Sequence, residues 1–424
     1  MITIERAPIP LRVAVLVGCF VASAAPGGAA SSALSLPPSI RTAGTGGAGS
    51  AAFWGGDPDA WSNPALLGHH GGLRFDSGST LYDTESGVAF HSARWSAAFG
   101  GIGVMGSGTP RGLSGTELTD DALPGTPGRT AQRIEMWGAG ISLAEAISSV
   151  MTMAGAAPPS LLARFDVAAG AMLNELNAGL IPDAQSRART TDYGVVARWT
   201  PVNTLEPRAT AAPEVATPGN WRWPQANDPA RTRRARDPRA GMFPDLRPKR
   251  TPEPRRFDLA YAYSVKNAGN RVLEHSSGSS DPLEKVARHG ASASMAHGRP
   301  RRFGGTPWLT RAFTPLYAAG IVGDLERIDP GDGTTSRNVQ RYGVEATYAN
   351  VFTLRRGRVK DAAAGFDGTT FGYSVGLDLG YLGGVRYDRA RVPQANGLPS
   401  LQRRGITAWV DPMVLLRAAR GRRH

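Results

Sequence analysis

The stretch Phe371-Gly372-Tyr373-Ser374-Val375-Gly376-Leu377-Asp378-Leu379-Gly380-Tyr381 decides the fold class. Large apolar or aromatic residues occupy every odd position, and small or polar residues occupy every even position. This period of two is that of a β-strand with one apolar face and one polar face. The run is eleven residues long, which suits a tilted strand that crosses a bilayer and exceeds most soluble strands. We therefore interpret it as a transmembrane β-strand.

The same alternation recurs along the chain, and many runs begin or end with an aromatic residue, as in the girdles of outer-membrane barrels. About fourteen runs can be drawn, with uncertain ends. They lie at residues 72–82, 86–97, 98–106, 131–143, 163–176, 191–201, 257–267, 285–297, 311–324, 338–348, 350–357, 368–380, 381–391 and 404–416. Because bacterial barrels have an even number of antiparallel strands, we predict an all-β, closed outer-membrane β-barrel.

Placing both barrel ends on the periplasmic side predicts which connections face outward. The outward loops are then those near 107–130, 177–190, 268–284, 325–337, 358–367 and 392–403. The segments near 144–162 and 202–256 face the periplasm. A soluble, exported β-sandwich or propeller is the alternative fold, although no repeat of about 40–50 residues is visible.

The first thirty residues have the three parts of a secretory signal. Arg6 and Arg12 precede the apolar segment 13–25, and small residues follow in PGGAASSA. This pattern predicts a signal peptide over residues 1–30 and export to the outer membrane of a Gram-negative type of cell. Cys19, the only cysteine, lies inside it. Leu16-Val17-Gly18-Cys19 also fits a lipoprotein signal, but the apolar segment continues past the cysteine, which favours ordinary cleavage.

The formal net charge of +13 comes mostly from segments outside the predicted strands. Residues 207–256 hold twelve Lys or Arg against five Asp or Glu, together with ten prolines, and residues 417–424 hold four arginines. The rest of the chain is nearly neutral, which argues against a nucleic-acid partner. We predict a barrel over residues 71–416, interrupted by a disordered insertion at 207–256 and followed by a basic tail at 417–424.

Signals for catalysis are weak, and we predict no catalytic residue and no cofactor. Two matches to G-x-G-x-x-G, at residues 44–49 and 101–106, do not join a strand to a helix, as a dinucleotide site requires. No G-x-S-x-G elbow at a strand-to-helix turn is predicted, because the match at residues 372–376 lies inside a predicted strand. His91, on a predicted strand near several serines, leaves a lipid-modifying barrel enzyme as a third functional alternative.

A metal site is not expected either. His69 and His70 lie near Asp57 and Asp59, which are residue types that ligate metals. Adjacent histidines on an extended chain point to opposite sides, however. We therefore interpret the two histidines as a solvated pair or as a pair at the rim of the plug.

Two sets of segments, in a fixed order, resemble a known family. Near the start they are Arg41-Thr42-Ala43-Gly44-Thr45-Gly46-Gly47-Ala48, then Asp57, Ala60 and Asn63-Pro64-Ala65-Leu66-Leu67. Near the end they are Arg341-Tyr342-Gly343-Val344-Glu345-Ala346-Thr347-Tyr348, then Leu354-Arg355-Arg356-Gly357 and Thr370-Phe371-Gly372-Tyr373-Ser374-Val375-Gly376-Leu377. This order resembles the PorV/PorQ family of outer-membrane barrels and, more distantly, the FadL-type transport barrels. Leu66 stands where that family has glycine, and the basic tail replaces its terminal aromatic residue.

The resemblance implies that residues 31–70 form a small plug inside the barrel. Asn63 can close a turn through its side chain, Pro64 restricts the backbone, and glycines allow close packing. The residues that carry the resemblance are therefore candidate site residues. In the plug they are Gly44, Gly46, Gly47, Asp57, Asn63, Pro64 and Ala65, and in the late strands Tyr342, Gly343, Glu345, Arg355, Gly357, Phe371 and Gly372.

Two functions follow from the resemblance. A PorV-type barrel would act as an accessory of type IX secretion, with exported proteins and secretion components as partners. A FadL-like barrel would be a channel for hydrophobic small molecules. We expect the lipid of the outer membrane as a partner in either case. An apolar lumen near the plug favours the channel, and extracellular loops able to grip a folded cargo favour secretion.

Overall fold

The computed structural model describes residues 39–54, 59–69, 71–81, 89–107, 116–119, 131–181, 184–203, 255–268, 272–275, 280–299, 314–331, 333–349, 351–378, 383–394 and 400–410. The expected signal peptide, most of the 207–256 insertion and the basic tail lie outside these residues. None of the helices within these residues is long and apolar enough to cross a bilayer.

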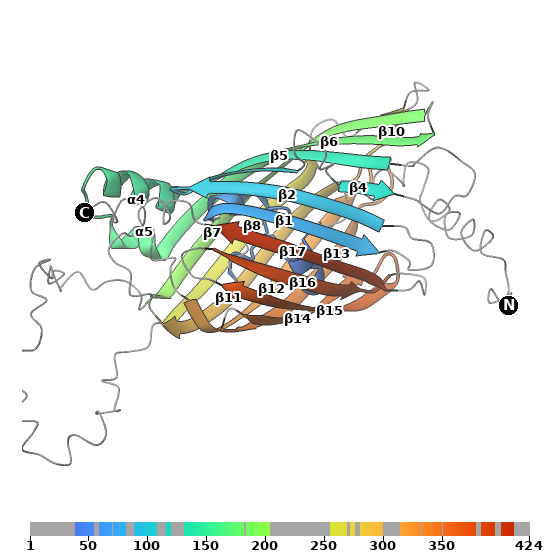
Figure 1. The fold of residues 1–424 in the computed structure, drawn as a ribbon. Coiled ribbons are helices and arrows are strands. Elements are labelled where there is room, and N and C mark those ends of the chain that lie inside the picture. Colours follow the sequence, from blue (N-terminus) through green and yellow to red (C-terminus); the bar gives the residue numbers. More distant parts are fainter. Residues whose placement is uncertain are drawn as a thin grey trace, which may run out of the picture.

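The described strands form one closed antiparallel barrel (Figure 1). Closure occurs where β1 pairs with both β2 and β17. The wall consists of β1 (Gly72–Leu81), β2 (Ala89–Phe99), β3 (Ile102–Ser107), β4 (Thr116–Thr119), β5 (Ala131–Ser142), β6 (Phe165–Ile181), β7 (Ala184–Asn203), β8 (Arg255–Ala268), β11 (Lys285–Arg299), β12 (Thr314–Asp329), β13 (Arg337–Tyr348), β14 (Phe352–Asp361), β15 (Phe366–Asp378), β16 (Gly384–Val392) and β17 (Leu401–Val410).

The barrel has fourteen strands in the described part of the chain. β3 and β4 occupy one position, because both pair with β2 and with β5. β9 (Val272–His275) and β10 (Ser280–Pro282) form a small hairpin at the edge of β7. The prediction of a closed all-β outer-membrane barrel is confirmed, and each of the fourteen expected runs overlaps one of its strands.

Several predicted loops are wrong, because the strands continue beyond the alternating runs that span the bilayer. β6 and β7 extend through most of 177–190, which was expected to be a loop. Strands also enter the expected loops at 107–130, 268–284, 325–337, 358–367 and 392–403. At the insertion, β8 already starts at Arg255. Outside the bilayer both faces of a strand can be polar, so the alternation ends while the backbone hydrogen-bond ladder continues.

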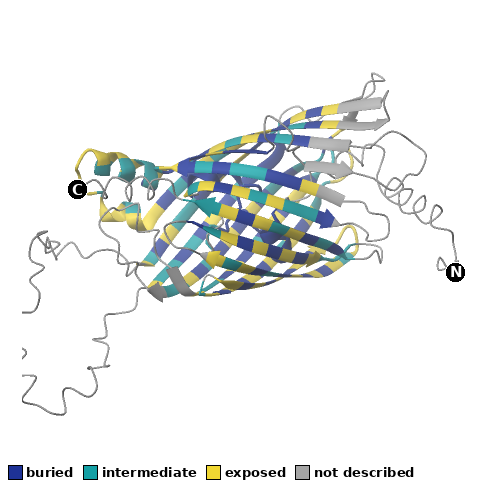
Figure 2. Cartoon of the chain, viewed as in Figure 1, coloured by how far each residue is buried: buried dark blue, intermediate teal, exposed yellow. Residues whose placement is uncertain are grey.

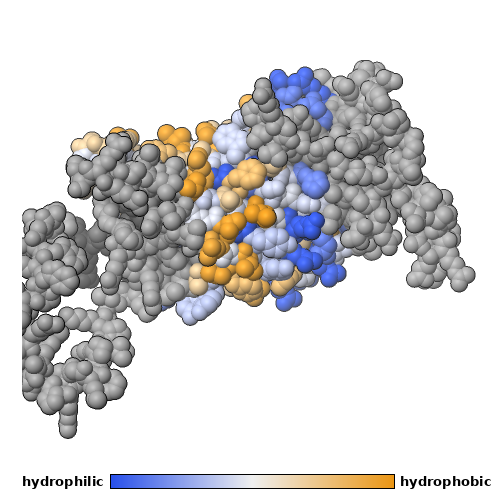
Figure 3. Space-filling model, in the orientation of Figure 1, coloured by the Kyte–Doolittle hydropathy of each residue, from blue (hydrophilic) through white to orange (hydrophobic). Residues whose placement is uncertain are grey.

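The wall is apolar outside and polar inside, as membrane barrels require. Along β13 and β14, buried and exposed residues alternate almost strictly, and the alternation recurs on neighbouring strands (Figure 2). The exposed positions include Leu73, Phe75, Val344, Leu354, Phe371, Val375 and Ile406, whereas the buried ones include Asp324, Glu326, Glu345, Arg355 and Asp388. Apolar side chains gather in a band across the visible wall (Figure 3).

The N-terminal segment fills the barrel. Residues 39–54 and 59–69, here called the plug, contain the helix α3 (Ile40–Gly44) and the 3-10 helix η2 (Pro64–His69). Most of their side chains are buried. Ser39 caps α3, because its hydroxyl accepts a hydrogen bond from Thr42 N.

Two short helices cover one end of the barrel. The connection from β5 to β6 contains α4 (Leu143–Met153) and α5 (Ser160–Arg164), both at the left in Figure 1. Ser142 is the N-cap of α4, and its hydroxyl accepts a hydrogen bond from Glu145 N at 3.4 Å. This end holds the connection that the sequence placed on the periplasmic side.

Candidate functional site

The late-strand glycines form a seat for the first part of the plug. Gly343 and Gly357 lie opposite each other on β13 and β14. A Cβ atom on Gly343 would lie 2.6 Å from Thr45 O, and one on Gly357 would collide with Gly46 N. Gly372 meets Gly44 in the same way, with 3.1 Å between its Cβ position and Gly44 Cα. The two segments that carry the family resemblance are therefore packed against each other.

The backbone geometry of the plug explains why glycine occupies several of its positions. Gly46 and Gly47 have φ angles of 75° and 82°, a region that glycine enters without steric cost. Gly44 O accepts a hydrogen bond from Thr370 Oγ1 at 2.9 Å, and Gly46 O accepts one from Arg341 Nη1 at 3.2 Å. Backbone carbonyls of the plug are thus satisfied by the barrel wall, as burial demands.

A second glycine track seats η2. Gly103, Gly140, Gly170 and Gly194 lie directly opposite one another across β3, β5, β6 and β7. Cβ atoms there would collide with Leu67 O, Pro64 O and the Asn63 side chain. Sequence reasoning missed this track. Its signal was a glycine at the same register in four successive strands, which requires knowledge of the pairing.

The Asn63-Pro64-Ala65 turn is anchored from both sides. Asn63 Nδ2 donates to Ser50 O at 3.1 Å and to Val195 O at 3.2 Å, while Asn63 Oδ1 accepts from Ala65 N at 3.0 Å. Pro64 is the first residue of η2, where its fixed φ and missing N–H suit a helix start. Leu66, which replaces the family glycine, is fully buried in a cluster with Ala65, Ala168 and Val196.

An ion network binds α3 to the wall. Arg41 donates from Nε and Nη2 to the two carboxylate oxygens of Glu345, at 2.8 and 3.1 Å. Arg355 Nε also donates to Glu345, at 2.6 Å, and Arg355 Nη1 reaches Asp388 Oδ1 at 3.0 Å. All four side chains are buried. Buried charges need such pairing, because an isolated ion costs several kcal/mol to desolvate.

Asp324 makes a second polar anchor on β12. Its carboxylate accepts hydrogen bonds from Gly49 N at 2.9 Å, Ser50 N at 3.1 Å and Ser50 Oγ at 2.6 Å. The plug therefore binds β12 through its backbone and β13 through Arg41. The cavity beside α3 holds only about 10 Å³ and is lined mostly by polar residues, so it has no room for an organic molecule.

Three of the predicted site residues do not join these contacts. Tyr342 and Phe371 point outward, with 44% and 51% of their surface exposed. Their side chains therefore belong to the outer wall. Asp57 lies outside the described residues.

The lumen wall is apolar on the side of β3, β5, β6 and β7. Met105, Ile134, Met136, Met172 and Leu176 are buried there in one cluster with Trp61 and Leu67 of the plug. These residues point inward, whereas the opposite wall carries the ion networks. A barrel interior is ordinarily polar, so this apolar half needs an explanation. None of these wall residues belongs to a motif that is visible in the sequence.

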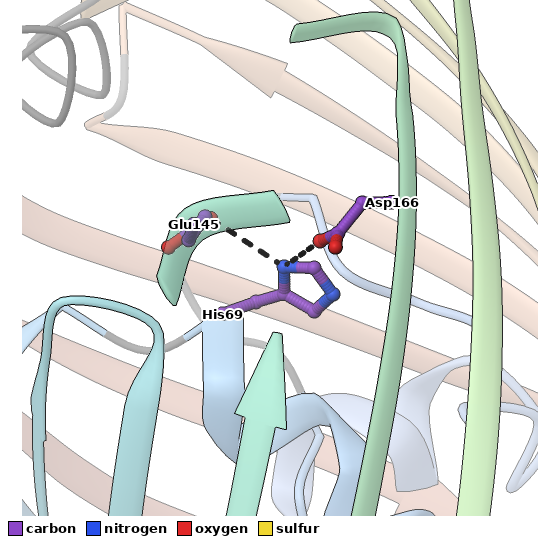
Figure 4. Close-up of side chains that lie close together, drawn as sticks. All are labelled: His69, Glu145 and Asp166. Atoms are coloured by element: carbon purple, nitrogen blue, oxygen red, sulfur yellow. Dashed lines mark ion pairs between the residues drawn. The ribbon is translucent and has the colours of Figure 1, made fainter. Parts of the chain in front are cut away.

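His69 is not solvated, so that part of the prediction is wrong, but it does end the plug helix η2. Its side chain is only 4% exposed, and it faces Glu145 of α4 and Asp166 of β6 instead of Asp59 (Figure 4). Burial lowers the pKa of His69 below its ordinary value, because a charged imidazole is poorly solvated there. His70 lies outside the described residues.

Comparisons with known proteins find a likeness in structure alone. No protein-family model and no curated protein matches the chain, so the PorV/PorQ resemblance stays a prediction. The toluene transporter TodX of Pseudomonas putida is 12% identical over 87% of this chain and 95% of that one, with a TM-score of 0.34. A FadL homologue of Pseudomonas aeruginosa is 11% identical over 87% and 98%, with a TM-score of 0.35. Values this low carry no conclusion about function.

Proposed function

We propose that this barrel is a channel for hydrophobic small molecules across the outer membrane, with the plug as its closed gate. The apolar half of the lumen wall carries the proposal. A wall that only enclosed water would gain nothing from Met105, Met136 and Met172, whereas sites for apolar ligands are lined in this way. Methionine side chains also adapt to ligands of different shape.

Passage requires movement of the plug. Trp61 and Leu67 of the plug cover the apolar wall, and the cavity beside α3 is too small for an organic molecule. The plug is held by hydrogen bonds and ion pairs to the wall, while the barrel is closed by its own strand ladder. The plug can therefore shift while the barrel stays intact.

Whole-cell uptake of 1-N-phenylnaphthylamine tests the proposal, because an intact outer membrane excludes this apolar dye, which fluoresces in lipid. Cells that produce the barrel should take it up faster than cells with an empty vector. Met172→Gln keeps the side-chain volume but buries an amide, which costs about 1–3 kcal/mol and should slow uptake about tenfold. Met172→Leu should retain the rate. Equal uptake in all four strains would contradict the proposal.

The type IX secretion role stays a prediction. It would need outward loops that grip a folded cargo, and the residues at 82–88, 108–115 and 120–130 lie outside the described part of the chain. No described residue favours that role over the channel.

A further inference from the structure

His69 is a buried side chain whose hydrogen-bonding groups are unmet. Only 8% of the surface of this residue is exposed. Even so, neither Nδ1 nor Nε2 has a hydrogen-bond partner within the described structure. Buried polar atoms are nearly always paired, and an unpaired one costs free energy. The ring nitrogens are therefore available to bind a partner that is not a hydrogen-bonding group of the protein.

Two carboxylates face this ring. Nδ1 lies 3.5 Å from Asp166 Oδ2 and 3.6 Å from Glu145 Oε1, which is too long for a good hydrogen bond (Figure 4). The three ligand atoms all lie within 4.8 Å of one another. Around a tetrahedral Zn²⁺ with bonds of about 2.0–2.2 Å, ligand atoms lie about 3.3–3.6 Å apart. Both distances from Nδ1 match that spacing.

We propose that His69, Glu145 and Asp166 bind a divalent transition metal such as Zn²⁺. One imidazole and two carboxylates form a ligand set that these ions accept, with a fourth position open to water. The positions of the carboxylates are fixed by the local fold. Asp166 accepts from Ser142 Oγ at 2.7 Å and from Ala144 N at 2.9 Å, and Glu145 lies in the first turn of α4.

The local charge also favours a cation. The two carboxylates supply negative charge beside the imidazole, whose ring nitrogens can serve as metal ligands. Arg198 Nη2, 3.8 Å from Asp166 Oδ2, offsets part of that charge. The Arg198 guanidinium also lies over the Phe53 ring, with its Cζ atom 5.5 Å from the ring centroid.

The metal would connect the plug to the barrel. His69 is the last residue of η2, whereas Glu145 and Asp166 belong to the wall and its covering helix. A bound ion therefore fixes the end of the plug that adjoins the apolar lumen wall. This inference concerns binding and plug order, so it holds independently of what the channel carries.

Zn²⁺ titration of the full chain tests the site. The barrel is purified in detergent without a polyhistidine tag, treated with a chelator, and titrated by calorimetry. We expect one equivalent of Zn²⁺ to bind. His69→Gln or Glu145→Gln should weaken binding by about 100-fold or more, because loss of a residue that only hydrogen-bonds a metal ligand already costs about 10–100-fold in affinity. His91→Gln, which alters an exposed histidine of β2, should bind as the wild type does. Absence of Zn²⁺ binding by a folded wild type, or equal binding by all variants, would overturn the proposal.

Hydrogen exchange tests the link to the plug. Zn²⁺ should slow exchange in a peptide that covers residues 59–69 in the wild type and leave it unchanged in His69→Gln. Glu145→Gln keeps the backbone bond from Glu145 N to the Ser142 hydroxyl, so it should fold normally, as judged by heat-dependent mobility on gels. Zn²⁺ binding that leaves plug exchange unaltered in the wild type would overturn the proposed role of the ion in holding the plug.

Discussion

Arg41 of the plug and Glu345 of β13 form a two-bond ion pair in the lumen, with Nε–Oε2 at 2.8 Å and Nη2–Oε1 at 3.1 Å. The same carboxylate accepts a hydrogen bond from Arg355 of β14. One acidic side chain thus pairs with a cation of the plug and a cation of the wall. It is therefore one of the points at which the docked plug depends on the barrel wall.

Glu345→Gln should destabilise the docked plug strongly. The amide removes the charge that both Arg41 and Arg355 need, and breaking a buried ion pair on one side costs about 3–5 kcal/mol. The free energy of unfolding, measured by guanidinium titration in lipid vesicles, should fall by about that amount. Asp367→Asn breaks the exposed Arg358–Asp367 pair on the outer wall and should leave the transition unchanged. Equal effects of the two variants would contradict the proposal that Glu345 holds the plug in the barrel.

Gly357→Val should expel the plug while the barrel still forms. A side chain at this position collides with the backbone at Gly46, and backbone cannot move aside as a flexible side chain can. The readout is maleimide labelling of Thr370→Cys, in a chain that also carries Cys19→Ser. Thr370 is fully buried under Gly44, so labelling reports plug displacement. Faster labelling is expected.

The matched control is Gly323→Ala on β12. A Cβ at Gly323 meets only Arg341 O, at 3.8 Å. This variant should label as slowly as the parent chain. If Gly357→Val also labels slowly and remains folded, the plug does not depend on the glycine seat.

The strands were predictable because their signal is local. Alternation such as that of 371–381 is readable within one segment, and it placed every barrel strand except β4. The seat of the plug was only partly predictable, because its glycines matter only when strand pairing brings them side by side. Gly140 means little until it lies opposite Gly103 and Gly170. His69 was misread for the same reason, since its partners come from a helix and a strand much later in the chain.

Phe371→Arg tests whether the apolar outer face lies in lipid. Phe371 is half exposed on the outer wall, and an arginine facing lipid near the midplane of a barrel costs about 2–4 kcal/mol. The free energy of unfolding from lipid vesicles should fall by that amount for Phe371→Arg and change far less for Phe371→Leu. Equal unfolding of the two variants would mean that this face does not contact lipid.

Asn63→Ala should loosen the plug without opening the barrel. The change leaves Ser50 O and Val195 O without the donor that Asn63 Nδ2 supplies. Leaving the buried Ser50 O without this donor costs about 1–3 kcal/mol, which raises the population of the displaced plug by about 5- to 150-fold. A cysteine at Ser264 reports this step, because the Ser264 hydroxyl donates to Ser62 O next to the turn, at 3.1 Å, and is buried. Its maleimide labelling should accelerate in Asn63→Ala.

Asn338→Ala, which alters an exposed asparagine of β13, should leave the rate unchanged. Unchanged labelling in a folded Asn63→Ala barrel would show that the turn only connects the plug to β1.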